Sequence, residues 1–225
     1  MVSRSFLKCL RLALLLAFAG SAPGIVTAQA QSFSADIVEQ HGDVSRPAGR
    51  LSVRDGKVRI ETSEHPDGFF LADAARPSAY FVRPAARVYM DAKQSSRLTR
   101  LFVSVDPGTP CRQWQAMARL AGIAGEGDWR CERIGEATID GRSTVVFRAL
   151  SDAGEAHVGW IDREHEFPLR IRTGDGSLFM LENIKDESLQ ASSFEIPAHA
   201  RKFSPEALIE RIKRSDVWVA KPDEP

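Results

Sequence analysis

The sequence predicts a mainly β protein with a few helices, an α+β fold whose strands form a β meander in a sandwich or barrel. Three observations lead to this prediction. Asp55-Gly56 marks a tight hairpin, and short β-branched or aromatic runs recur between turn signals. No crossover helix separates the strand signals between 137 and 184, so antiparallel neighbours are expected there.

The first 30 residues have the composition of a secretory signal peptide. A basic start is followed by an apolar run over 12–19 and then by small residues that suit cleavage after Ala28 or Ala30. The apolar run is too short to span a bilayer as a stable helix. We therefore expect a mature periplasmic chain, residues 31–225, that forms a single domain and does not span the membrane.

Charge and length exclude some classes of function. The chain has 30 basic and 30 acidic residues, and its first 30 residues hold three basic and no acidic ones, so residues 31–225 carry a net charge of −3. No global basic character points to nucleic acid. The remaining length is sufficient for one domain with a sizeable core.

The hairpin around Asp55-Gly56 organises the first half of the domain. A type I′ turn needs two residues that tolerate positive φ, and Asp-Gly supplies them. Apolar pairs then share one face of the hairpin, and a charge pair lies on the other. The expected partners are Arg50 with Glu61, Leu51 with Ile60 and Val53 with Val58.

The other elements follow in order along the chain. Strands are expected at 33–40, 69–72, 79–82 and 87–90, and then a helix at 111–120 with an apolar stripe. Strand signals return at 129–131, 137–139, 144–147, 157–161, 169–172 and 178–184, and Phe194–Pro197 is expected to close the last strand region. Ser204-Pro205 resembles an N-cap with proline at the first helical position, which predicts a C-terminal helix over 205–214.

Two cysteines, Cys111 and Cys131, follow the predicted signal peptide. An even pair in an exported protein predicts a disulfide, which would join the helix at 111–120 to the sheet. The alternative is two free thiols in a reducing compartment.

Four segments together resemble the LolA-like superfamily of exported bacterial proteins. They are the hairpin 49–61, the pair of strands from Tyr80 to Tyr89, Trp160–Asp162 leading to Phe167–Arg170, and Ser193–Pro197. The resemblance implies a strongly curved antiparallel sheet, an open half-barrel with helices in its mouth. It also implies that the concave face takes acyl chains or a lipoprotein's lipid anchor.

These expectations favour a periplasmic binding or carrier protein that shields a lipid, an acylated protein or another hydrophobic ligand. A sheet of about ten strands tends to curl, and an inner face left uncovered by two helices would be an apolar groove. The alternative is that the helices fill the concavity as an ordinary core. The second hypothesis for function is therefore an envelope protein–protein interaction or sensor module without a lipid ligand.

One local excess of positive charge is a candidate contact for an anionic ligand or an acidic partner. The basic residues are Arg83, Arg87, Lys93, Arg97 and Arg100. The alternative is a solvated strand edge on which basic residues prevent edge-to-edge pairing.

Signals for catalysis and metal binding are weak. The sequence has no nucleophile elbow, zinc-protease motif or phosphate loop, so we expect neither an enzyme nor a cofactor. The densest titratable cluster, Asp162, Glu164, His165 and Glu166, fits a solvated turn better than a metal site. Gly174-Asp-Gly176 lacks the further acidic ligands of a calcium loop and is expected to be a plain turn.

Overall fold

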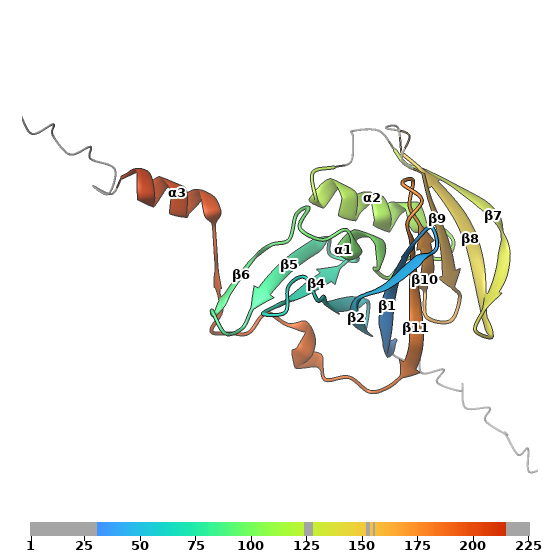
Figure 1. Cartoon of the computed structure of the whole chain (residues 1–225), viewed down its shortest axis with the longest axis horizontal. Helices are drawn as coiled ribbons and strands as arrows, with labels where there is room; N and C mark the ends of the chain where they lie inside the picture. Colours follow the sequence, from blue (N-terminus) through green and yellow to red (C-terminus); the bar gives the residue numbers. More distant parts are fainter. Residues whose placement is uncertain (1–30, 124–127, 152–153, 155, 215–225) are drawn as a thin grey trace, which may run out of the picture.

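The computed structural model describes residues 31–123, 128–151, 154 and 156–214 (Figure 1). The predicted signal peptide, residues 1–30, lies outside the described part of the chain. Among the described residues, no helix is long and apolar enough to cross a membrane.

Twelve strands form one open sheet, in the order β12-β6-β5-β4-β3-β2-β1-β11-β10-β9-β8-β7. The strands are β1 (Ser32–His41), β2 (Val44–Arg54), β3 (Lys57–Glu61), β4 (Phe69–Asp73), β5 (Ser78–Arg83), β6 (Val88–Asp91), β7 (Arg130–Ile139), β8 (Arg142–Leu150), β9 (Ala156–Asp162), β10 (Phe167–Arg172), β11 (Leu178–Asp186) and β12 (Arg201–Lys202). The helices are α1 (Leu98–Leu101), α2 (Pro110–Leu120) and α3 (Pro205–Lys213), and η1 (Ala191–Phe194) is a 3₁₀ turn. The predicted mainly β, α+β class is confirmed.

The sheet consists of two meanders that meet at its centre. Strands β1 to β6 run outward from the centre in sequence order, and strands β7 to β11 return to it, where β11 pairs antiparallel with β1. The two edges, β7 and β12, do not pair with each other. The result is the open, curved sheet that was predicted (Figure 1).

The predicted hairpin is confirmed in turn and register. Asp55 and Gly56 have φ values of 49° and 78°, and the three predicted pairs face each other across β2 and β3. Asp140 and Gly141 form the same kind of turn, with φ values of 49° and 80°. Both turns form where local sequence supplies residues that tolerate positive φ.

The main core lies between the concave face of the sheet and helices α1 and α2. Side chains of β1 to β5 and β8 to β11 join Leu98, Leu101, Trp114 and Met117 in one continuous cluster. Helix α2 matches the predicted helix at 111–120, whereas the short helix α1 is an addition to the predicted elements. The helices therefore fill much of the concavity.

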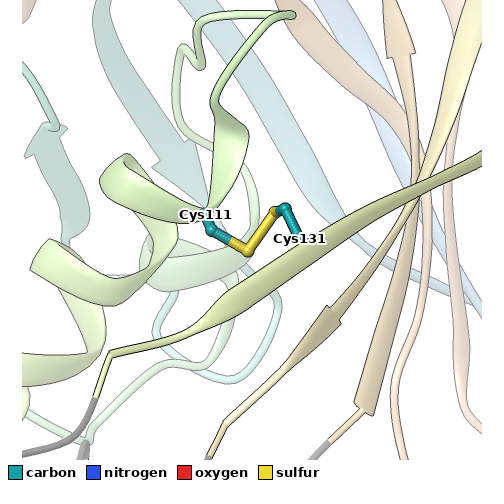
Figure 2. Close-up of a disulfide and its surroundings, with 2 residues drawn as sticks. All are labelled: Cys111 and Cys131. Atoms are coloured by element: carbon teal, nitrogen blue, oxygen red, sulfur yellow. A yellow bond between two sulfur atoms is a disulfide. The ribbon is translucent and has the colours of Figure 1, made fainter.

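A disulfide joins α2 to the edge strand β7 (Figure 2). Cys111 lies in the first turn of the helix and Cys131 near the start of the strand, with Cα atoms 5.6 Å apart. The predicted pairing is confirmed. Because β7 is an edge strand paired only with β8, the disulfide adds a cross-link between this strand and helix α2.

The outer face of the first meander is covered by a segment that we call the outer strap, residues 189–197. Phe194 is buried, and Ile196 packs against Phe69, Leu71 and Val82. The prediction of a last strand at Phe194–Pro197 is wrong, because η1 and an irregular segment occupy this part of the chain. These apolar residues are buried against a sheet face rather than paired in a ladder.

The last elements in the described part of the chain are β12 and α3. Strand β12 is an addition to the predicted strands and pairs parallel with β6, so the otherwise antiparallel sheet has one parallel pair at this edge. The predicted C-terminal helix is confirmed, and the Ser204 hydroxyl accepts a hydrogen bond from the Ala207 amide at 3.2 Å. A serine cap followed by proline accounts for the start of the helix.

Candidate functional site

The part of the concavity that the helices leave open is a cavity of about 390 Å³, which we call the mouth cavity. It lies between α1, α2, the start of β9 and the turn that joins β10 to β11. Its lining combines apolar and charged side chains, with Arg97, Arg100, Leu101, Trp114, Ala118, Ile123, Trp129, Gly154, His157, Thr173, Gly174 and Asp175.

Trp114 of α2 forms one wall of the mouth cavity and lies against the backbone of β9. A Cβ atom added at Gly159 would lie 2.5 Å from Trp114 Cη2, a distance that a real side chain does not allow. The Trp114 indole donates a hydrogen bond to the Leu101 carbonyl at 3.2 Å. Because residue 159 is glycine, the Trp114 indole can pack between α2 and β9.

Trp129 and His157 supply further aromatic lining of the cavity, with ring centroids 5.7 Å apart. Ile123, three residues after the end of α2, also lines the cavity and is 40% exposed. Aromatic and aliphatic walls of this kind favour an apolar ligand group.

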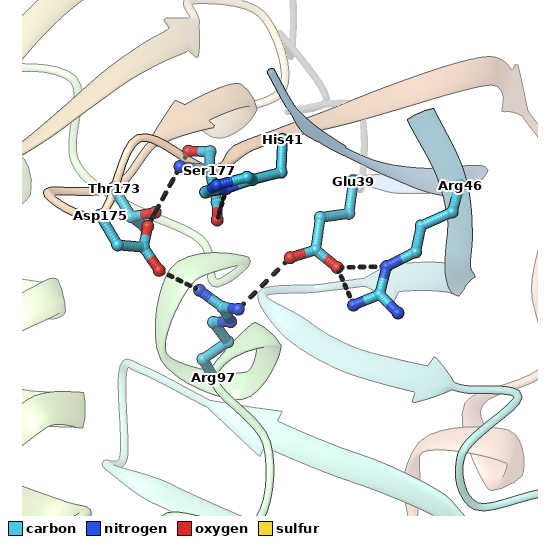
Figure 3. A network of polar contacts seen from close by, with 7 residues as sticks. All are labelled: Glu39, His41, Arg46, Arg97, Thr173, Asp175 and Ser177. Atoms are coloured by element: carbon cyan, nitrogen blue, oxygen red, sulfur yellow. Dashed lines mark hydrogen bonds and ion pairs between the residues drawn. The ribbon is translucent and has the colours of Figure 1, made fainter. Parts of the chain in front are cut away.

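Arg97 sits at the edge of the cavity in a network of ion pairs (Figure 3). Its guanidinium donates to Asp175 at 3.0 Å and to Glu39 at 3.3 Å. Glu39 also accepts two hydrogen bonds from Arg46, at 2.7 and 3.0 Å. Arg97 thereby joins the start of α1 to β1 and to the β10–β11 turn.

Asp175 is held as a carboxylate in this network. The Thr173 hydroxyl donates to it at 2.5 Å, and the Ser177 amide donates at 3.1 Å. These two hydrogen bonds, with the one from Arg97, lower the pKa of Asp175 well below its ordinary value. Gly174-Asp-Gly176 is thus the expected turn, and its aspartate also anchors Arg97.

Arg97 also borders two further hollows, of about 300 and 450 Å³. The larger one is lined by Arg100 as well, and by polar residues of 62–65 and 94–96. Three hollows therefore share Arg97 as a lining residue, and the one of about 450 Å³ is lined mainly by polar residues.

The predicted basic stretch divides into two groups. Arg97 and Arg100 line the mouth cavity, whereas Arg83, Arg87 and Lys93 lie on β5, the β5–β6 turn and the segment after β6. Arg83 pairs with Asp67, and Lys93 Nζ lies 3.8 Å from Glu206. Of the five residues, only Arg97 and Arg100 line the mouth cavity, and a role in contacting an anionic ligand or partner stays a prediction.

The cluster at 162–166 is different from the solvated turn that was expected. Asp162 is only 2% exposed, and His165 lies between two carboxylates, 2.7 Å from Asp162 and 2.8 Å from Asp186. Arg142 completes the cluster at 3.1 Å from Asp186. Only Glu164 and Glu166 are exposed as expected. In the described part of the chain, no group of His, Cys, Asp and Glu residues is arranged to hold a metal ion.

Hydrogen bonds shift the pKa values within this cluster in opposite directions. The Asp162 carboxylate raises the pKa of His165, with a further contribution from Asp186, and burial opposes the shift. Burial would raise the pKa of Asp162, but hydrogen bonds from His165 and the Glu164 amide together lower it. The cluster therefore favours a charged histidine between charged carboxylates.

A separate hollow of about 650 Å³ lies on the outer face, between the outer strap and strands β3 to β5. Leu71, Tyr80, Phe194 and Ile196 supply its apolar lining, and Lys57, Asp73, Arg76 and Glu195 surround them. It is separated from the mouth cavity by the sheet.

Sequence patterns did not reveal all the residues of the mouth cavity. Trp129 and His157 fall in the strands expected at 129–131 and 157–161, and no pattern there marks a binding site. Trp114 falls in the helix expected at 111–120, which has an apolar stripe. Trp129 and His157 meet because β8 pairs with both β7 and β9, so that the starts of these two strands flank the end of β8, and no local pattern could have identified them.

Neither a family model nor a curated protein sequence matches this chain. Solved structures match it with modest scores. PNGF-II has a TM-score of 0.48 at 6% identity, covering 82% of this chain and 33% of that one. The LolA superfamily protein NE2245 from Nitrosomonas europaea has a TM-score of 0.34 at 14% identity, covering 75% and 91%. MucB in complex with MucA(peri) has a TM-score of 0.39 at 14% identity, covering 79% and 58%.

The chain thus spans a third of PNGF-II and just over half of MucB. The superfamily that the sequence resembles is represented among the matched structures. At these identities and scores, the likenesses carry no conclusion about ligand or activity, which must be argued from this chain's own residues.

Proposed function

We propose that this chain is a non-enzymatic binding or carrier protein of the periplasm, which shields the apolar part of a lipid, an acylated protein or another hydrophobic ligand. The observation that carries the proposal is the mouth cavity, with its walls of Trp114, Trp129 and Ile123 beside two arginines. Transfer of apolar ligand surface from water to these walls would stabilise the complex by about 25 cal/mol per Å².

The size of the cavity limits the ligand. A volume of about 390 Å³ is near the lower end of the range for small-molecule sites, roughly 300–1,000 Å³. One acyl chain or part of one suits this space better than a whole diacyl lipid. An anionic group on the ligand would lie near Arg97 and Arg100, where it would compete with Asp175 and Glu39 for Arg97.

Two features support a location outside the cytoplasm. The Cys111–Cys131 disulfide is of a kind that persists in oxidising compartments. The composition of residues 1–30 is that of an export signal.

Native mass spectrometry of the protein purified without detergent tests the proposal. We expect an added mass that fragments to a fatty acid or phospholipid. The variant Ile123→Glu places a charge at the cavity wall and is expected to lower the fraction of loaded protein at least tenfold. Ile134→Glu is the matched control, since Ile134 on β7 is similarly exposed, at 41% against 40%, and does not line the cavity.

The second candidate is an envelope protein–protein interaction or sensor module without a lipid ligand. It is favoured by the extent to which α1 and α2 fill the concave face, which leaves only a small cavity. A bare mass in the native spectrum, together with no binding of a fluorescent fatty acid, would reject the carrier hypothesis in favour of this module.

A further inference from the structure

Helix α3 projects from the domain at the β12 edge of the sheet (Figure 1). It follows β12 directly, and the Ser204 cap fixes its first turn. Lys93 reaches Glu206 at 3.8 Å, so the base of the helix lies beside the end of β6. The rest of the helix extends beyond the sheet.

One side of α3 is apolar and exposed. Leu208, Ile209 and Ile212 are 42%, 51% and 40% exposed. Their spacing of one and four residues places them on one side of a helix, since 3.6 residues complete each turn. An apolar stripe on a helix that projects from the core is typical of a surface that contacts a membrane or another protein.

Basic residues accompany this stripe along the β6–β12 edge. The segment 201–214 contains five basic residues and two acidic ones, in a chain that has equal numbers of both overall. Both acidic residues already have lysine partners, Glu206 with Lys93 and Glu210 with Lys213. Among the described residues, Arg87 and Arg201 form no ion pair, and they are neighbours because the Arg201 amide donates to the Arg87 carbonyl at 2.9 Å.

The apolar area of the α3 stripe indicates whether its binding partner is a protein or a lipid surface. A stable protein–protein interface buries about 800 Å² on each partner, far more than three half-exposed side chains supply. An interfacial helix on a lipid surface needs less, because shallow apolar insertion combines with attraction between basic residues and anionic headgroups. Apolar side chains on α3, together with arginines that form no ion pair on the strand edge that leads into it, match the chemistry of an anionic lipid surface.

We propose that α3 and the adjoining β6–β12 edge form a docking surface for an anionic lipid bilayer. Leu208 and Ile209 would enter the headgroup boundary, and Arg87 and Arg201 would contact lipid phosphates. This surface lies apart from the residues that line the mouth cavity, so docking does not depend on what the cavity binds.

Vesicle flotation tests the docking surface, using the chain as the cell exports it, with its N-terminus defined by intact-mass spectrometry. The probe vesicles are phosphatidylcholine alone and phosphatidylcholine with 30% phosphatidylglycerol. We expect recovery with the anionic vesicles only, and a loss of recovery as salt is raised, since screening weakens surface electrostatics. The double variant Leu208→Ser, Ile209→Ser is expected to reduce partitioning at least tenfold, and Arg87→Gln with Arg201→Gln about three- to tenfold.

Val44→Ser with Ile134→Ser is the matched control, because it removes two exposed apolar side chains elsewhere on the sheet and should leave flotation unchanged. An unchanged melting temperature shows that each variant is folded. Equal recovery on neutral and anionic vesicles, or wild-type recovery of the α3 variant, would overturn the proposal. So would a concentration-dependent dimer that the α3 variant abolishes, since a second copy would then be the occupant.

Discussion

Strands β4 and β7 belong to the same sheet but are stabilised in different ways. Four of the five side chains of β4 are buried, because α1 and α2 cover one face of the first meander and the outer strap covers the other. Most of β7 is exposed on both faces. It is held by its ladder with β8 and by the disulfide at Cys131.

This difference shows why strands in one sheet have different sequence patterns. A strand covered on both faces reads as a continuous apolar run, such as Phe69-Phe-Leu-Ala72, whereas a strand with covering on neither face can carry charges throughout. It also implies that local stability varies across the sheet, with the first meander most resistant to opening.

The largest expected effect comes from the doubly covered strand. Phe70→Ala removes a side chain that is 1% exposed and contacts Phe81, with ring centroids 4.8 Å apart. The cavity left by the missing phenyl ring should lower the free energy of unfolding, measured by urea titration, by about 3–5 kcal/mol. Ile134→Ala on β7 is the control and should change it by less than about 1 kcal/mol. Similar losses for both variants would contradict the contrast between the strands.

Removal of the disulfide should affect the other region. Cys111→Ser with Cys131→Ser opens a loop with a sequence separation of 20 and is expected to cost about 3 kcal/mol. Hydrogen exchange measures where the loss occurs. We expect faster exchange in β7 and the first turn of α2, with β3 to β5 protected as before. An equal increase across the sheet would contradict the role assigned to the disulfide.

The His165 cluster should give the second meander a pH-dependent stability. Because the pKa of His165 is raised in the folded state, its contribution to the free energy of unfolding is complete below the ordinary value of 6.5. This contribution is lost as pH rises through the folded-state pKa. The lowered pKa of Asp162 means that its contribution is complete above 3.8 and is lost as pH falls through the folded-state pKa. The contribution of the cluster is therefore largest between about pH 4 and 6.5.

His165→Gln tests this window. It removes the charged hydrogen-bond partner of the buried Asp162 carboxylate and leaves Arg142 at 3.6 Å, so we expect a loss of about 1–3 kcal/mol near pH 5.5 that becomes smaller towards pH 9. Urea titrations of both proteins from pH 4 to 9 measure the difference. Glu164→Gln in the same turn is exposed and should leave the profile unchanged. A pH-independent loss would mean that His165 acts through packing alone.

The smallest effect is expected at the outer strap. Ile196 is partly buried against Phe69 and Leu71, so Ile196→Ala should lower the free energy of unfolding by about 1 kcal/mol. Val44→Ala, at a residue that is 68% exposed, should have almost no effect. If Ile196→Ala matches that control, the outer face of β4 is not stabilised by the strap.

Local sequence was sufficient for the elements whose geometry depends on neighbours in the chain. Asp55-Gly56 determined a turn and, through it, the register of three side-chain pairs. Ser204-Pro205 determined the start of α3. The presence of two cysteines after the predicted signal peptide was sufficient to predict the Cys111–Cys131 disulfide. Each of these depends on backbone φ, a cap or a covalent bond, all of which act over a short range or between two identifiable residues.

Tertiary structure alone decided what covers each face of the sheet. The apolar residues of the outer strap predicted a strand, but Phe194 is buried and Ile196 packs against side chains of β4, and neither pairs in a ladder. The parallel contact of β12 with β6 and the charged cluster of Arg142, Asp162, His165 and Asp186 join elements that are distant in sequence. Sequence periodicity reports whether a side chain is buried, but the partner that buries it depends on how the two meanders and the C-terminal segment meet in space.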